Sequence, residues 1–350
     1  MISLSLVRLL GLSCGLVCLL FLFRRLRSGV QDWSRTGWLV LFFLLTTLIS
    51  LFPSLMNFPA EIFYLGEVQG GRVIAATIFS SIFLWIVILS DRSREQGKML
   101  LIERMLRILL VRQSLSDLRP VLEGADIVII VPSYNEVDNL RELLPRLPQS
   151  CCGRSVRVLV VDDGSHDCTS DLVRQSGHCV ISHPVNMGGG AALMTGYETV
   201  RLLGVPFLVT MDADGQHDPG EIDSLVAPLL NGEADLVIGS RILGAHHRES
   251  QLRHWGVLFF SRLINLLMGT KITDCSCGFR ALDAKILAKL DLRQNQYYAA
   301  ETIVLASKIG FRIIERPVTI YRRTSGKSKK GGGFVYGLSF MKVIIKNWWR

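Results

Sequence analysis

Phe-Leu-Val-Thr-Met-Asp-Ala-Asp-Gly-Gln, residues 207 to 216, is the stretch of this chain that most constrains its fold. Its apolar start predicts a short buried strand, and two carboxylates, Asp212 and Asp214, follow that strand with one residue between them. Ligands bind beyond the carboxyl ends of strands in open α/β sheets, so we expect a binding site here. Two neighbouring oxygen donors suit a hard cation such as Mg²⁺ or Mn²⁺. Asp-x-Asp also occurs in ordinary loops, so the surrounding sequence is needed to distinguish a cation site from an ordinary loop.

Outward from this stretch, strand and helix patterns alternate from residue 126 onward. The expected strands cover residues 127–131, 156–161, 179–182, 207–211 and 236–239. The expected helices cover residues 137–147, 169–176, 190–203 and 219–230. This alternation predicts an α/β fold with a mainly parallel sheet and helices on both faces.

Two further strands of this set also run into polar turns. Residues 131–136 read Val-Pro-Ser-Tyr-Asn-Glu, and residues 161–165 read Val-Asp-Asp-Gly-Ser. Parallel strands end at one edge of a sheet, where Tyr134 can stack on a base and a carboxylate can bind a ribose. Each turn alone could be an ordinary helix cap, but three in register favour a nucleotide site. Glycines 188–190 precede an expected helix, and backbone amides at such a helix start attract anions.

The amino-terminal part differs in composition. Three apolar stretches, residues 2–23, 37–56 and 73–90, are each about as long as a helix that crosses a bilayer. A signal peptide is the alternative for the first stretch, and a buried hairpin for the other two. Basic residues 24–35 and the basic residues after position 90 predict cytosolic segments, whereas residues 57–71 carry only acidic charges. We therefore expect an integral membrane protein with three spans, its amino terminus outside and its catalytic part cytoplasmic.

The chain thus divides into four expected parts. Residues 1–90 form an α-helical membrane domain, residues 91–124 a connecting helix, residues 125–330 the α/β domain, and residues 331–350 an interfacial tail. A packed terminal helix is the alternative for the tail, whose cations and tryptophans suit a lipid surface. The net charge of +9 is assigned to an anionic membrane surface and not to a nucleic acid, and a homo-oligomer is compatible with the sequence. The eight cysteines lack zinc-finger spacing and are expected to be free thiols.

These residues resemble family 2 glycosyltransferases of the GT-A fold, and most closely the dolichyl-phosphate and polyprenyl-phosphate sugar synthases. The resemblance runs from about residue 126 to residue 330. Besides the turns already quoted, it rests on Met211-Asp-Ala-Asp-Gly-Gln-His-Asp-Pro219, Gly239-Ser-Arg241, Asp274-x-x-Cys-Gly-Phe-Arg280, Glu315-Arg-Pro317 and Arg323-x-x-Gly-x-Ser-Lys329. Residues 251–255, Gln-Leu-Arg-His-Trp, have the wrong spacing for the motif of processive synthases, so transfer of a single sugar is favoured.

The resemblance implies a role for each matching residue. A Mg²⁺ or Mn²⁺ ion would be held by Asp212, Asp214 and Gln216, and Asp214 and Arg241 would be catalytic. The nucleotide sugar would contact Pro132, Tyr134, Glu136, Val161, Asp163, Asp212, Ala213, Asp214, Arg241, Arg323 and Lys329. The acceptor phosphate would contact Arg241, Arg253, Ser261 and Arg280.

The implied reaction transfers one hexose, with inversion, from a nucleotide sugar of the GDP-mannose or UDP-glucose type to a polyprenyl or dolichyl phosphate. A hydroxyl acceptor is the first alternative and would need a general base, for which Asp274 and Glu301 are candidates. A domain that binds nucleotide sugar without turnover is the second. A nucleotidyltransferase is the third, but it should carry a glycine-rich loop near the first strand, where this chain has Pro132-Ser133-Tyr134.

Overall fold

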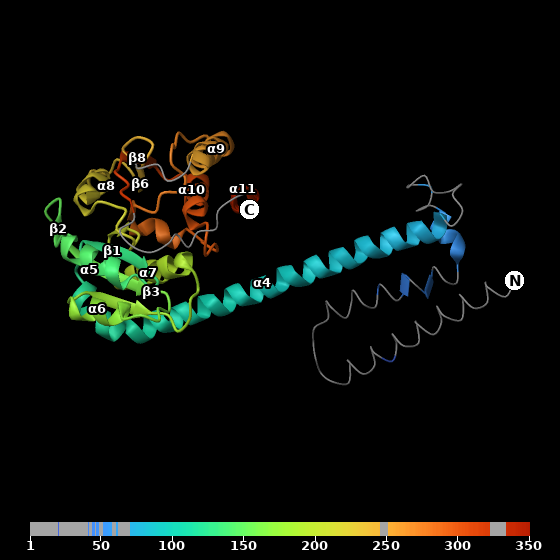
Figure 1. Ribbon diagram of the computed structural model, residues 1–350, viewed down its shortest axis with the longest axis horizontal. Coiled ribbons are helices and arrows are strands. Elements are labelled where there is room, and N and C mark those ends of the chain that lie inside the picture. Colours follow the sequence, from blue (N-terminus) through green and yellow to red (C-terminus); the bar gives the residue numbers. More distant parts are fainter. Residues whose placement is uncertain are drawn as a thin grey trace. The chain divides into compact units, whose positions relative to one another are not determined.

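The computed structural model describes residues 71–245, 251–322 and 334–350, together with residues 20, 41, 44, 45, 47, 48, 52–57 and 61. The chain divides into two compact units, Met1–Leu100 and Leu101–Arg350. Helix α4, Gly71–Leu122, begins in the first unit and ends in the second (Figure 1).

Little of the expected membrane domain is described. The first two expected spans lie almost wholly outside the described residues, apart from isolated positions and the short helix η1, Pro53–Met56. The third lies within α4, where Trp85 and Leu89 are exposed. Among the helices that are described, none combines the length and the apolar character needed to cross a bilayer. The three-span arrangement therefore stays a prediction.

The second unit is built on a mixed sheet. Its strands are β1 (Ile127–Ser133), β2 (Ser150–Cys151), β3 (Arg154–Asp162), β4 (Cys179–Ser182), β5 (Phe207–Thr210), β6 (Leu236–Ser240), β7 (Arg280–Asp283) and β8 (Ile313–Pro317). They lie in the order β2-β3-β1-β5-β7-β6-β8, and β4 pairs with β3. Residues 127–131 of β1 are all fully buried. Since successive side chains of a strand point to opposite faces, both faces of the sheet are covered at its centre.

One strand corrects the prediction of a mainly parallel sheet. Strand β7 lies between β5 and β6 and is antiparallel to both. An antiparallel strand begins at the edge where its parallel neighbours end. The segment before β7, residues 273–279, is thereby brought to the same edge as the acidic turn that follows β5.

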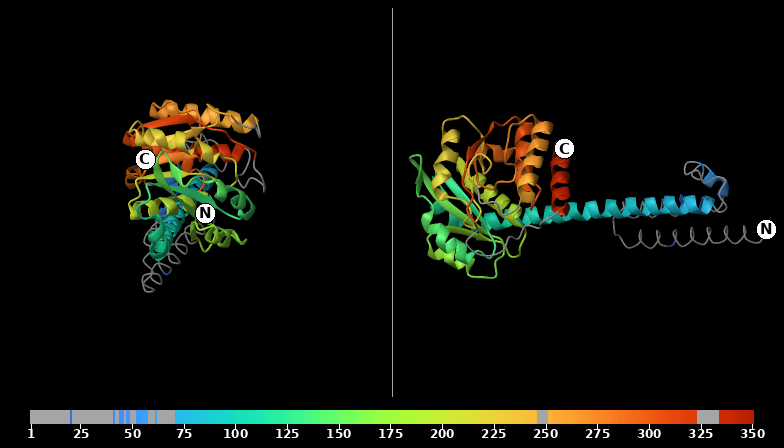
Figure 2. Two further views of the ribbon diagram at one scale, coloured as in Figure 1. Left: turned by 90° about the vertical axis from the view of Figure 1, so that its left-hand side faces the viewer. Right: turned by 45° about the horizontal axis from the view of Figure 1, so that its top comes forward.

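Helices pack around this sheet (Figure 2). They are α5 (Val137–Leu143), α6 (Thr169–Gln175), α7 (Gly189–Leu203), α8 (Ile222–Leu230), α9 (Gln251–Met268), α10 (Tyr298–Ile309) and α11 (Phe334–Trp349). Helix α7 lies on β1 and β3, and a side chain at Gly196 would collide with Ile130, only 2.5 Å away. Helix α8 lies on β5, β6 and β7.

The expected tail forms helix α11, which packs against α9 and α10. Its inner side buries Phe340 and Ile344, whereas Ile345 and Trp349 are exposed. Features of both tail interpretations, a packed terminal helix and a surface helix, are thus present in one amphipathic helix.

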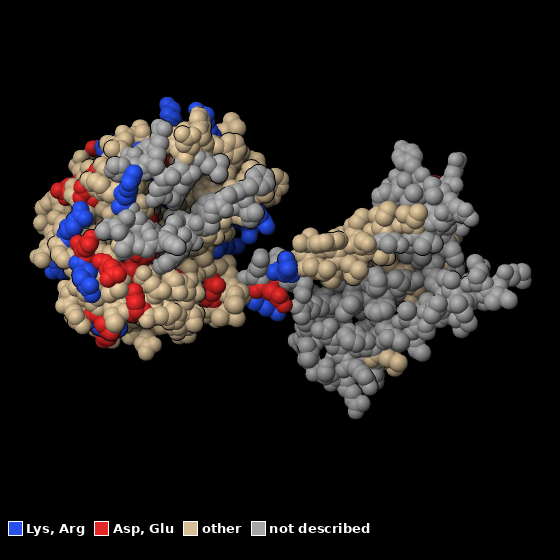
Figure 3. Space-filling model, viewed as in Figure 1, with Lys and Arg blue, Asp and Glu red and all other residues tan. Residues whose placement is uncertain are grey.

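Figure 3 shows that acidic and basic side chains are interspersed on the visible face of the second unit.

Candidate functional site

The acidic turn after β5 gathers the three predicted metal ligands. The Asp212 side chain is partly exposed, at 28%, whereas Asp214 is buried. The backbone N–H of Gln216 donates to Oδ1 of Asp214 at 3.2 Å, which closes the turn. The amide nitrogen of Gln216 donates to the carbonyl of Tyr321 at 3.0 Å, and the N–H of Tyr321 donates to the carbonyl of Gln216 at 2.8 Å. The turn is therefore fixed to the segment that follows β8.

The donor set of this turn fits a hard divalent ion. It supplies two carboxylates and one amide oxygen, which are the ligand types that Mg²⁺ and Mn²⁺ prefer. Among the described side chains, no third His, Cys, Asp or Glu joins these two carboxylates in a ligand cluster. An ion held here would thus keep coordination positions for oxygens from a substrate.

Two residues beside the turn were not given a role from the sequence. Nε2 of His217 lies 3.8 Å from Oδ2 of Asp212, and the His217 ring lies 5.0 Å from the ring of Phe279. His217 is buried, and its Nδ1 has no hydrogen-bond partner within the described part of the chain. Gly278 lies so close that an added Cβ would be 3.0 Å from Oδ1 of Asp212. The sequence motif at residues 274–280 already indicated that Gly278 has a role. Its contact with Asp212 could not be predicted from the sequence.

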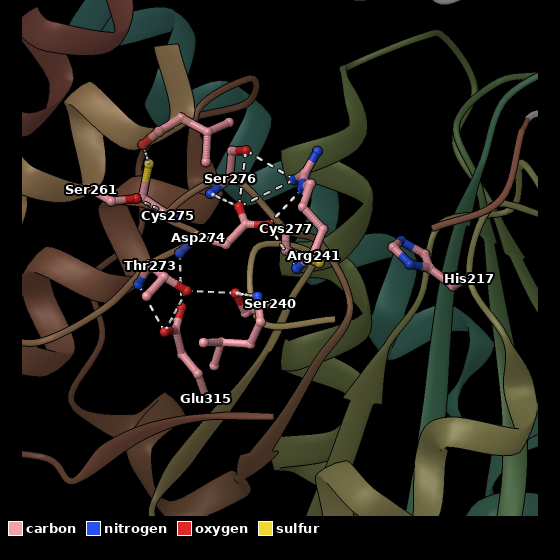
Figure 4. A network of polar contacts seen from close by, with 12 residues as sticks. His217, Ser240, Arg241, Ser261, Thr273, Asp274, Cys275, Ser276, Cys277 and Glu315 are labelled. Atoms are coloured by element: carbon pink, nitrogen blue, oxygen red, sulfur yellow. Dashed lines mark hydrogen bonds and ion pairs between the residues drawn. The ribbon is translucent and has the colours of Figure 1, made fainter. Parts of the chain in front are cut away.

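Arg241 follows β6 and forms an ion pair with Asp274 (Figure 4). Its Nε donates to Oδ2 of Asp274 at 2.5 Å, and its NH2 group donates to Oδ1 of Asp274 at 3.3 Å and to Oγ of Ser276 at 3.0 Å. Although burial opposes the charge of Arg241, the Asp274 carboxylate holds the pKa of its guanidinium above the ordinary value. The predicted phosphate-binding arginine is thus fixed in its charged form.

A second carboxylate, that of Glu315, holds the loop that carries Asp274. Glu315 of β8 accepts hydrogen bonds from the backbone N–H groups of Thr273 and Asp274, both at 2.8 Å. The hydroxyls of Ser240 and Thr273 lie 2.6 Å apart. Strands β6 and β8 therefore position the loop that carries Asp274, and Figure 4 shows this network around Asp274.

Asp163 holds the glycine-rich turn. Its carboxylate accepts hydrogen bonds from the backbone N–H groups of Met187, at 2.9 Å, and Gly188, at 2.7 Å. Nδ1 of His183 lies 2.7 Å from the same carboxylate, and Nε2 of His183 lies 2.8 Å from the hydroxyl of Thr195. Asp163, His183 and Thr195 are buried, so Asp163 shapes the loop. Its direct contact with a nucleoside stays a prediction.

The glycine run has a role that differs from the expected one. The N–H of Gly190 donates to the carbonyl of Asn295 at 2.7 Å, and a Cβ at Gly190 would lie 2.4 Å from the carbonyl oxygen of Gln294. The N–H of Gly190 is therefore not available to an anion, because a backbone carbonyl of the 294–295 segment already accepts its hydrogen. Gly189, the first residue of α7, is exposed, so an anion site at the start of this helix stays a prediction.

The turns after β1 and β3 lie side by side, as predicted. Pro132 pairs with Val161 in the parallel register of the two strands. The hydroxyl of Ser165 accepts the N–H of Asn135 at 2.8 Å, and the side-chain oxygen of Asn135 accepts the N–H of His166 at 2.8 Å. Tyr134 and Glu136 are half-buried beside these bonds, and Ala213 is buried in the acidic turn.

Two of the predicted acceptor-phosphate residues are buried and hydrogen-bonded within the protein. Arg280 is fully buried and donates to the carbonyls of Cys277 and Ala299, both at 2.8 Å. Ser261 is buried on α9, and its hydroxyl accepts the N–H of Cys275 at 3.0 Å. Both side chains hold the loop before β7, and their contact with an acceptor phosphate stays a prediction. The side chain of Arg253 and residues Arg323 and Lys329 lie outside the described residues, so their roles stay predictions.

The acidic turn, the Arg241–Asp274 pair and the turns after β1 and β3 thus lie at one edge of an α/β sheet, which is where ligands bind in this class of fold. Residues 128–291 match the family described as Glycosyl transferase family 2. The polyprenol monophosphomannose synthase of Mycolicibacterium smegmatis is 34% identical over 220 residues, which are 59% of this chain and 81% of that protein. The chain belongs to glycosyl transferase family 2, and it is a glycosyltransferase.

Two further proteins are similar to this chain. The undecaprenyl-phosphate mannosyltransferase of Micrococcus luteus is 30% identical over 223 residues, covering 60% of this chain and 89% of that protein. The crystal structure of glucosyl-3-phosphoglycerate synthase from Mycobacterium tuberculosis matches with a TM-score of 0.50 at 19% identity, over 67% of this chain and 83% of that chain. This structural likeness confirms the expected GT-A fold of the second unit.

Proposed function

We propose that this glycosyltransferase moves one hexose from a nucleotide sugar to a polyprenyl phosphate, with inversion, at the cytosolic face of a membrane. The observation that carries the proposal is the acidic turn with Asp212, Asp214 and Gln216, placed at the same sheet edge as the Arg241–Asp274 pair. The names of the relatives, which include a polyprenol monophosphomannose synthase and an undecaprenyl-phosphate mannosyltransferase, support a polyprenyl phosphate as acceptor.

The residues of the site divide the work between two anionic substrates. Asp212, Asp214 and Gln216 would hold a divalent ion, which when bound stabilises the charge on the leaving nucleotide. Arg241 is held by Asp274 in one orientation, so its guanidinium offers a fixed positive charge to a phosphate. The turns at Tyr134 and Asn135 would bind the nucleoside. Pre-ordered cations of this kind offset the repulsion between a phosphate acceptor and the diphosphate of the donor.

Burial of the candidate bases favours a phosphate acceptor over a hydroxyl acceptor. Asp274 is fully buried and accepts hydrogen bonds from Arg241 and Ser276. Glu301 is also fully buried and accepts the N–H groups of Arg293 and Gln294. Their burial and existing hydrogen bonds count against a role for either carboxylate as the base. A phosphate monoester needs no such base, because its second pKa is about 6 and it is mostly dianionic in the cytosol.

The surface of the second unit supports a lipid-bound acceptor. Helix α9 exposes Trp255 and Phe259, and helix α11, which packs against it, exposes Trp349 and Lys346. Exposed aromatic and cationic side chains of this kind suit the headgroup layer of a membrane. A prenyl chain would stay in the bilayer while its phosphate reaches the site.

A donor screen with an isosteric variant tests this function. Purified protein in detergent is incubated with Mg²⁺ or Mn²⁺, a polyprenyl phosphate and labelled GDP- or UDP-sugars. We expect one labelled lipid product that requires the ion, and Asp214→Asn should lower its rate by about 10²-fold or more. Asp171→Asn, an exposed carboxylate of α6, is the matched control and should keep full activity. Equal rates for Asp214→Asn and wild type, or labelling of a hydroxyl acceptor only, would contradict the proposal.

A further inference from the structure

The hairpin formed by β2 and β3 places two neighbouring thiols beside a carboxylate from another element. Cys151 ends β2, Cys152 begins the turn, and their sulfur atoms lie 4.0 Å apart. Asp223 stands in the first turn of α8. One oxygen of its carboxylate and the two sulfur atoms all lie within 4.8 Å of one another. Among the described residues, no other group of His, Cys, Asp and Glu side chains gathers three ligand atoms in this way.

The fold alone does not call for a cysteine at position 152. Cys152 and Gly153 both have positive φ, of 49° and 72°, as the two central residues of a tight hairpin turn require. Glycine and asparagine adopt this conformation at low cost, whereas other side chains are strained in it. The exposed thiol of Cys152 contacts the backbone carbonyl of Asp223 at 3.7 Å. The strained residue thus points its sulfur toward α8.

The electrostatics of the group favour a cation. Two thiolates and a carboxylate with ligand atoms all within 4.8 Å of one another would bring three negative charges together. A bound metal ion deprotonates the thiols that coordinate it and neutralises their charge.

We propose that Cys151, Cys152 and Asp223 form a site for a thiophilic divalent cation of the Zn²⁺ class. Two sulfur ligands of a tetrahedral zinc ion, each about 2.3 Å from the metal, lie roughly 3.8 Å apart, close to the separation seen here. A disulfide would instead require the sulfur atoms to approach to about 2.05 Å. Binding releases the two thiol protons to solvent, and water completes the fourth position.

This site is separate from the acidic turn and independent of the proposed function. The hairpin lies at the amino end of β3, whereas Asp212 follows the carboxyl end of β5; both strands run parallel to β1, so the two sites are at opposite edges of the sheet. Their chemistry also differs, since the acidic turn offers only oxygen donors. A cation held here would clip the hairpin to α8.

Cobalt is the probe for the test, because thiolate-to-cobalt charge transfer gives an absorption band in the near ultraviolet that carboxylates do not. Full-length protein in detergent is titrated with Co²⁺ in the presence of excess Mg²⁺, which occupies the acidic turn. We expect the band to saturate at one Co²⁺ per chain and to disappear on addition of Zn²⁺. Cys152→Ser should weaken Co²⁺ binding by more than the roughly 10–100-fold that loss of an outer partner causes.

Two matched variants make the result specific. Cys168→Ser removes an exposed cysteine elsewhere and should keep the band, whereas Asp223→Asn should weaken binding while leaving both thiols in place. Cys152 is exposed, so its replacement should not prevent folding, and a thermal melt without metal checks this. Absence of the band, a band unchanged in Cys152→Ser, or loss of two titratable thiols to a disulfide without metal would each overturn the proposal.

Discussion

At the scale of single residues, the ion pair of Arg241 and Asp274 is expected to be a stability element as well as part of the site. Asp274 is fully buried, so Arg241→Met would leave a carboxylate inside the protein without its counter-charge. Loss of one partner of a buried pair costs about 3–5 kcal/mol. We therefore expect the free energy of unfolding in urea to fall by about this amount.

Two controls separate charge from packing in this experiment. Arg293→Met breaks an exposed pair with Asp291 and should cost only about 0–1 kcal/mol. The double variant Arg241→Met with Asp274→Asn removes the buried charge altogether and should recover part of the loss, which a double-mutant cycle measures. Equal losses in the free energy of unfolding for Arg241→Met and Arg293→Met would show that the buried pair stabilises the protein no more than the exposed pair does.

Glu301 should make stability depend on pH. Burial raises the pKa of its carboxyl, although the N–H groups of Arg293 and Gln294 act in the opposite direction. A carboxyl whose pKa is raised on folding stabilises the protein below its unfolded pKa, about 4.3, and this contribution is lost as pH rises through the folded pKa. Glu301→Gln cannot ionise, so its stability relative to wild type should increase as the pH rises above about 4.3. A difference in unfolding free energy that does not change with pH would contradict this assignment.

At the scale of elements, the contact between α7 and the 294–295 segment predicts opposite outcomes for two adjacent glycines. A Cβ at Gly190 would press on two backbone carbonyls, whereas a Cβ at Gly189 meets nothing within 4 Å. Gly190→Ala should lower the free energy of unfolding by about 1–3 kcal/mol through overpacking. It should also raise the KM for the nucleotide sugar, because a shift of residue 190 would displace Gly188 and the Asp163 carboxylate that is bonded to it. Gly189→Ala should leave the free energy of unfolding and the KM unchanged. Similar behaviour of the two variants in urea unfolding would rule out the close contact.

The elements up to β6 could be predicted from the sequence because their patterns are local. The strand over Cys179–Ser182 has the predicted bounds, and the other predicted strands of this part differ by one or two residues at one or both ends. The two-residue strand β2 was not predicted, because it is too short to show a pattern. The part after residue 240 was not predicted in this way. Strand β7 has only four residues and begins with Arg280, which reads as a surface residue. Its burial depends on carbonyls from Cys277 and Ala299, and no local pattern shows that they converge.

The same distinction applies to the site. The turns after β1, β3 and β5 were predicted to meet because parallel strands end together, and they do. His217, Gly278 and the role of Asp274 as partner of Arg241 were missed, since each depends on the antiparallel course of β7. Long-range pairing therefore decides which side chains complete a site whose position the sequence already indicates.

At the scale of the whole molecule, the remaining proposal concerns the side of the membrane on which the second unit works. Its apolar amino-terminal stretches and the basic segments beside them predict a cytosolic second unit. Two cysteines of that unit, Cys152 and Cys168, are exposed, and with a chelator present to remove any cation from Cys152 both serve as natural labels. A membrane-impermeant maleimide should label the protein in inside-out membrane vesicles but not in right-side-out vesicles. Because Cys14 and Cys18 lie in a predicted span, the double variant Cys152→Ser with Cys168→Ser should lose the label in both preparations. Labelling of the wild type from the outside would place the second unit away from cytosolic nucleotide sugars and would refute the predicted orientation. Release of unlabelled protein from the membrane by a high-salt wash would refute the predicted spans.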